Sequence, residues 1–187
     1  MIRIAITAQR TILGVTPSWC YARRWGLSFM HISRPLTGAL IAVTLHVSMA
    51  MAGPLEDGAA AGRKGDYATA LRLFLPLAEQ GKARAQAALG FLYYNGFGVP
   101  KDYAVAAEWN RKAAEQGDAG AQLYLSFIYG DGLGVPKDYV LAYMWANLAA
   151  SRGSEDAKKS RDLLEPLMTP DQIAEAQRLA REWKPRQ

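Results

Sequence analysis

The sequence predicts an all-α fold: an α/α superhelix, or solenoid, of three antiparallel helix pairs followed by a C-terminal capping helix. Two observations predict it. The hexapeptide Gly-Val-Pro-Lys-Asp-Tyr occurs at residues 98–103 and again at residues 134–139. Residues 65–100 are identical to residues 101–136 at 18 of 36 positions, and a third copy begins at residue 137. Such self-similarity is typical of stacked helical hairpins, none of which buries its apolar face alone.

The first 52 residues have the charge pattern of an export signal. They contain five arginines and no Asp or Glu, whereas the rest of the chain balances 17 basic against 17 acidic residues. The apolar run at residues 35–52 ends in Ala50-Met51-Ala52, a small-x-small cleavage site. We therefore expect residues 1–29 to be a non-physiological upstream extension, with Met30 as the true start. Residues 30–52 are expected to be a signal peptide cleaved near Ala52, giving a periplasmic or secreted protein.

Three alternatives to cleavage remain at this stage. The apolar run could be retained as a membrane anchor, although it is short for a span of about 20 residues and contains polar side chains. The acid-free lead also fits a mitochondrial presequence, and Arg23-Arg24 loosely resembles a twin-arginine signal. Sec-type export is favoured because Arg23-Arg24 lies too far from the apolar run.

Cleavage would also remove every cysteine and histidine of the chain. Cys20, His31 and His46 are the only cysteine and histidines, and all precede Gly53. The mature chain would have no disulfide, no thiolate nucleophile and no imidazole base. We therefore predict no cofactor, no metal and no enzymatic activity, and the balanced charge argues against nucleic acid as a partner.

Residues 53–64 are expected to form a short helix or a loose lead, and three repeats follow at 65–100, 101–136 and 137–168. In each repeat, apolar residues recur at three- and four-residue steps, the spacing of an amphipathic helix. In the first helix of the second repeat, for example, the pattern includes Tyr103, Ala106, Ala107, Ala113 and Ala114.

Glycine, proline and aspartate mark the ends of these helices. Gly81, Gly117 and Gly153 stand where the chain must turn in a left-handed conformation within each repeat. In the joint between repeats, glycines release the chain from one hairpin and Pro blocks helix continuation, while Asp102 caps the next helix.

The last segment departs from the repeat pattern. In the third copy, Leu125 and Tyr129 are replaced by Arg161 and Glu165, as expected where stacking stops. Thr169, Pro170 and Gln172 then form a helix start, so residues 169–187 are predicted to be a capping helix and tail over the open end of the third hairpin. Earlier in the chain, Pro76 is expected to bend or loosen the first helix.

The repeated segments resemble a known family. Ala-Glu-Gln-Gly-x-Ala-x-Ala-Gln, the Tyr-x-x-Gly-x-Gly-Val-Pro-Lys-Asp-Tyr joint and the Trp of Ala-x-x-Trp are similar to the Sel-one-like repeat, a relative of the tetratricopeptide repeats. The resemblance covers about residues 65–153. It implies an antiparallel helix-pair solenoid with a concave face, in proteins that act mostly as adaptors or scaffolds.

The polar face of the first helix in each repeat is the predicted contact surface for a protein or peptide. The candidate residues are Arg72, Glu108, Arg111, Lys112, Met144 and Leu148. Trp109 and Trp145 occupy equivalent places and are expected to pack between helices. A second copy of the chain is also a candidate partner.

The sequence leaves two rival functions open. In one, Glu108 and Glu115, two helical turns apart, would serve as the carboxylates of a cell-envelope hydrolase. In the other, a retained N-terminal segment would tether the scaffold to a membrane, which is the only membrane contact that we expect.

Overall fold

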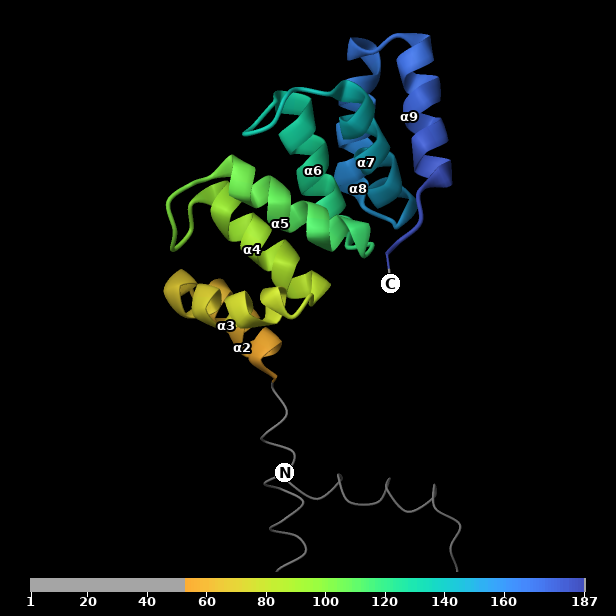
Figure 1. Ribbon diagram of the computed structural model, residues 1–187. Coiled ribbons are helices and arrows are strands. Elements are labelled where there is room, and N and C mark those ends of the chain that lie inside the picture. The colour runs from red at the N-terminus through yellow and green to blue at the C-terminus, as the bar shows by residue number, and fades with distance from the viewer. Residues whose placement is uncertain (1–52, 187) are drawn as a thin grey trace, which may run out of the picture. The chain divides into compact units, whose positions relative to one another are not determined.

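The computed structural model describes residues 53–186, and the predicted extension and signal peptide lie outside these residues. The described part contains α-helices and one short 3-10 turn at Glu165–Leu167, and no strand (Figure 1). The helices are α2 (Pro54–Arg63), α3 (Tyr67–Glu79), α4 (Ala83–Asn95), α5 (Tyr103–Glu115), α6 (Ala119–Asp131), α7 (Tyr139–Ser151), α8 (Glu155–Leu164) and α9 (Pro170–Glu182). The predicted all-α class is confirmed.

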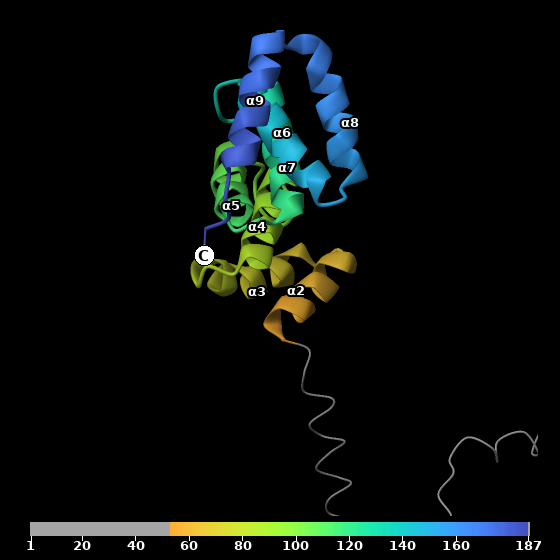
Figure 2. The ribbon, with the colours of Figure 1, turned by 90° about the vertical axis from the view of Figure 1, so that its right-hand side faces the viewer.

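Each helix packs against the next along the chain as far as α8. The pairs α3–α4, α5–α6 and α7–α8 are hairpins closed by tight turns, and α4 packs on α5 just as α6 packs on α7. The predicted superhelix of three helix pairs is therefore present, with α2 packed on α3 at its N-terminal end. Helix α9 leaves the series, because it packs on α7. Figure 2 shows α8 and α9 flanking α7.

The predicted helix starts are formed by aspartates. Asp66, Asp102 and Asp138 each accept a hydrogen bond from a backbone N–H three residues later, at 3.1, 3.0 and 3.0 Å. In α9, Thr169 and Gln172 form the reciprocal capping box that their spacing predicts. Helix α3 continues through Pro76 to Glu79, so the proline does not end it.

The glycines of the joints have a second role beyond releasing the chain. Gly98 and Gly134 adopt φ of 71° and 67°, and each lies against the start of the first helix of its own repeat. A Cβ on Gly134 would be 2.5 Å from the backbone nitrogen of Ala104. The joint therefore closes back on the preceding first helix, a contact that the sequence did not indicate.

A repeated glutamine ties the two helices of a hairpin together. Gln86 and Gln122 donate from Nε2 to the carbonyl oxygens of Ala78 and Ala114, at 3.1 and 3.3 Å. These carbonyls lie in the last turns of α3 and α5, where they also accept the backbone N–H groups of Gly81 and Gly117. The final Gln of the repeated Ala-Glu-Gln-Gly-x-Ala-x-Ala-Gln segment thus links the second helix of a hairpin to the end of the first.

Close packing between hairpins depends on small residues. Asn110 of α5 is fully buried against α4, and a Cβ on Gly90 would lie 2.5 Å from its side-chain carbon. Leu89, Leu125 and Ile128 of the second helices are also fully buried. These contacts bury the faces by which neighbouring hairpins meet. The exposed outer faces of the first helices are the candidate site.

Candidate functional site

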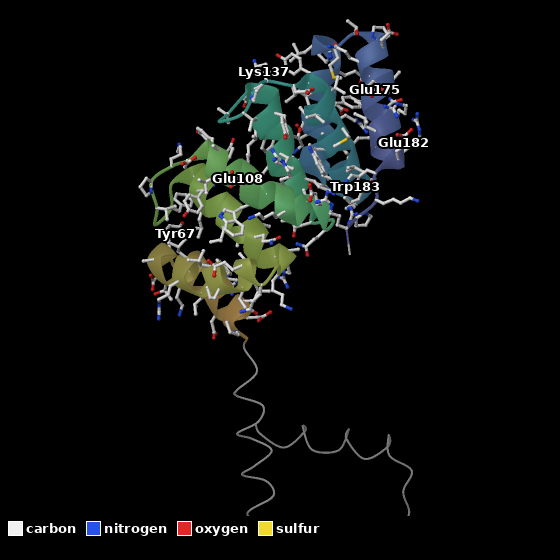
Figure 3. All side chains as sticks on the ribbon, in the orientation of Figure 1. Tyr67, Glu108, Lys137, Glu175, Glu182 and Trp183 are labelled. Atoms are coloured by element: carbon white, nitrogen blue, oxygen red, sulfur yellow. The ribbon has the colours of Figure 1, made fainter. Side chains whose placement is uncertain are left out.

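Helix α5 presents the charged part of the predicted contact surface. Glu108, Arg111 and Lys112 are exposed, and Trp109 is half-buried between them (Figure 3 labels Glu108). The Lys112 ammonium lies 4.3 Å from the centre of the Trp109 ring, a cation–π contact. Arg111 donates from Nη2 to the Tyr129 hydroxyl at 3.0 Å. The α5 patch, made of Glu108, Trp109, Arg111 and Lys112, is therefore a half-buried indole with charged side chains around it.

Arg72 lies one repeat earlier, exposed on α3 at the position equivalent to Glu108. Leu75, three residues on, is 40% exposed, and the adjoining Pro76 is also exposed. Trp109 itself packs against the apolar cluster that α3 and α4 bury. The indole thus joins the outer face of α5 to the hairpin before it.

The structure removes Met144 and Leu148 from the accessible surface, contrary to their selection as contact residues. They are 6% and 8% exposed, because α9 packs on this face of α7. Their apolar character, where earlier repeats carry charges, marks an internal contact. The predicted capping helix is α9, and it packs on α7 of the third hairpin.

Aromatic and charged side chains take part in the contact between α7 and α9. The rings of Trp145 and Trp183 meet edge to face at 6.3 Å, and the Arg152 guanidinium lies 5.6 Å from the Trp183 ring centre. Arg152 also donates to the carbonyl of Gly117 at 2.7 Å. Beyond α9, Arg186 pairs with Glu115 at 2.7 Å, so the tail reaches the end of α5.

A row of aromatic side chains that the sequence did not predict joins the hairpins. This aromatic strip joins Tyr67, Phe97, Phe91, Tyr124 and Phe127, with successive ring centres 4.5, 5.7, 6.0 and 6.2 Å apart. Burial raises the pKa of Tyr124. Phe91 and Phe127 stand 36 residues apart, and this spacing was the available signal.

The carboxylates proposed for a hydrolase are held differently. Glu108 is exposed on the α5 patch, whereas Glu115 is engaged by Arg186. Among residues 53–186, no three Asp, Glu, His or Cys side chains gather into a group that could hold a metal ion. The two glutamates therefore differ in their surroundings, because Glu115 forms an ion pair and Glu108 forms none within residues 53–186.

The lysines of the two joints lie beside tyrosines. The ammonium groups of Lys101 and Lys137 are 5.6 and 5.5 Å from the ring centres of Tyr103 and Tyr139. Both lysines are exposed.

No helix in the described range is both long and apolar enough to cross a membrane.

The chain is similar to known proteins in both sequence and structure. The Sel1 repeat family model matches residues 46–82, 83–118 and 119–154. The last two matches span α4–α5 and α6–α7, so they start at the second helix of the hairpins defined above. Among curated proteins, no sequence matches the chain.

Two solved structures are similar to it. One is a protective antigen of uropathogenic Escherichia coli strains with an SLR fold, at 33% identity and a TM-score of 0.66 over 78% of this chain. The other is a Sel1 repeat protein from Oxalobacter formigenes, at 29% identity and a TM-score of 0.57 over 70% of this chain. The chain spans 33% and 54% of the lengths of these proteins.

The family generally provides non-catalytic helical scaffolds for contacts between proteins. The three matches together cover more than half of the residues, and the helices have the arrangement of the solved relatives. The chain belongs to the Sel1 repeat family.

Proposed function

We propose that this chain is an exported scaffold that binds a segment of another protein on the outer face of α3 and α5, and that this face is the concave side of the solenoid. The observation that carries the proposal is the docking of α9 on α7. An amphipathic helix of the chain itself covers this face in the third repeat, burying Met144, Trp145 and Leu148. This contact supports the proposal that the equivalent surface of α5 also accepts a helix.

The equivalent positions of α5 differ in exposure and charge. Glu108, Trp109 and Lys112 stand 36 residues before Met144, Trp145 and Leu148. Both charged residues are exposed, and no helix of the described part covers them. A partner segment on α5 would repeat the contact that α9 makes on α7, with charge pairs in place of apolar ones.

The charges of this face favour a partner that carries carboxylates. Arg72, Arg111 and Lys112 are basic, whereas Glu108 is the one candidate with a negative charge. Opposite charge on the partner would speed association and fix its register. The Trp109 ring offers an apolar contact at the centre, where such residues contribute most to binding.

Site-specific photo-crosslinking in living cells tests this assignment. A photoreactive amino acid at Lys112 or Arg72 is expected to give a defined adduct with a partner protein. The same amino acid at Arg181, an exposed residue of α9, is the matched control and should not give this adduct. Charge reversal by Arg111→Glu should reduce the yield from position 72 at least about tenfold. Adducts that form only from position 181 would contradict the proposed face.

Export is supported by the position of the expected cleavage site relative to the fold. Gly53 is the N-cap of α2 and Pro54 its first residue, so cleavage after Ala52 would leave every described helix whole. We therefore propose that the mature protein acts in the periplasm or outside the cell.

N-terminal sequencing of the protein recovered from its host checks the export proposal. The expected first residue is Gly53. Recovery of a chain that still contains residues 30–52, in the membrane fraction, would instead favour the tethered scaffold.

A further inference from the structure

A groove lies between α6 and α8, and its lining includes no residue of α3 or α5, the helices assigned to the partner. It has a volume of about 620 Å³, enough for several side chains. Its apolar lining includes Tyr124 and Phe127, the last two members of the aromatic strip, and Leu163, Leu164 and Leu167. No helix of the described part fills it.

Two leucines project beside this groove. Leu163 and Leu167 are 73% and 57% exposed, the highest values among the large apolar residues of the described part. Leu163 occupies the position of Phe91 and Phe127 in the preceding repeats. Single exposed leucines are ordinary, but two of them next to an apolar hollow form an interaction surface.

The floor of the groove does not call for a polar ligand. The buried hydroxyls of Ser126 and Ser160 bond to each other at 2.9 Å, so each already has a partner. Charged residues lie only toward the rim, where Asp156 is paired with Lys159 at 3.0 Å. A small polar molecule would find few converging groups, whereas apolar side chains would find a matching surface.

The patch is complementary to itself. It contains both a projection, Leu163 and Leu167, and the hollow that could receive it. Its lining also contains Asp131 and Lys137, neither of which forms an ion pair within residues 53–186 (Figure 3 labels Lys137). A two-fold interface brings the same patch of two subunits together, so it requires both kinds of complementarity on one surface.

We propose that this groove is the interface of a symmetric homodimer, in which Leu163 and Leu167 of each copy enter the groove of the other and Asp131 of one faces Lys137 of the other. The interface lies at the side of the array, so the copies do not extend the solenoid end to end. The end itself is unsuited to stacking, because Arg161 and Asp162 pair with each other where the earlier repeats carry Leu and a small residue.

Sedimentation equilibrium of the full chain, as recovered with its own N-terminus, tests the proposal. We expect a dimer at micromolar concentrations. Leu163→Asp with Leu167→Asp should weaken dimerisation about a hundredfold or more, since it places charges in an apolar contact. Both side chains are exposed in the single chain, so the monomeric variant should retain the helical circular dichroism signal of a folded protein.

Charge exchange provides the matched control. Asp131→Lys alone and Lys137→Glu alone should each weaken the dimer, because each puts like charges together twice across the two-fold axis. The double exchange should restore it. A wild-type chain that stays monomeric, a dimer indifferent to the leucine variant, or a groove that captures a different protein while the chain is monomeric would each overturn the proposal.

Discussion

Replacing Gly134 by alanine is expected to lower the free energy of unfolding by about 3 kcal/mol or more. The left-handed backbone at φ 67° costs an alanine about 1–2 kcal/mol. In addition, the new methyl would lie 2.5 Å from the Ala104 nitrogen and 2.8 Å from the Tyr103 carbonyl carbon, and this backbone has little freedom to move. The joint would have to open.

Gly153→Ala is the matched control for this variant. Gly153 has φ of 90°, but its Cβ would meet nothing within 4 Å. Its cost should therefore be the conformational part alone, about 1–2 kcal/mol. Urea unfolding followed by circular dichroism measures both variants. Equal losses would show that the joint does not lie against the start of the preceding first helix.

Placing a charge at Ala176 is the second large change. Ala176 is fully buried in the contact between α9 and α7, so Ala176→Glu should detach α9 and lower the free energy of unfolding by about 3 kcal/mol or more. Ala174→Glu makes the same substitution at an exposed position of the same helix and should change stability by less than about 0.5 kcal/mol. Thermal unfolding of the two variants side by side gives the comparison.

A result in which both α9 variants are equally stable would mean that α9 does not bind α7. A result in which both are equally destabilised would assign the effect to the propensity or charge of α9. Only a difference between positions 174 and 176 reports the contact itself.

Much of this fold could be predicted because each repeat contains the same helix caps, turn glycines and apolar positions at the same spacing. The aspartate caps, the left-handed glycines and the apolar stripes act locally, so the spacing of residues in the sequence is enough to place them. The polar ending of the third repeat was also readable, since Arg161 and Glu165 replace apolar residues. These features fix the helices and their order of stacking.

The surface on which α9 packs could not be predicted in the same way. The stripe of Ile173, Ala176, Ala180 and Trp183 predicted an amphipathic helix, and these residues do pack on the third hairpin. A stripe does not say which surface receives it, because that depends on the turn at residues 165–168. Met144 and Leu148 were the available signal for this contact, because they are apolar at positions that are charged in α5.

The candidate site was also predicted only in part, and for the same reason. Residues whose exposure follows from helical position, such as Glu108, Arg111 and Lys112, were placed correctly on the surface. Residues whose environment depends on a distant segment were not. Both the burial of Met144 and the groove beside Leu163 arise from where α8 and α9 lie relative to α7, which no local pattern encodes.

Hydroxyl-radical footprinting of the full chain tests most directly whether the outer face is closed on α7 and open on α5. Methionine and tryptophan react readily when water reaches them, so side-chain oxidation read by mass spectrometry reports their exposure. Met144 and Trp145 should be protected in the wild-type chain and become reactive in Ala176→Glu, while Trp109 should react in both. Rapid oxidation of Met144 in the wild-type chain, or full protection of Trp109, would contradict the account.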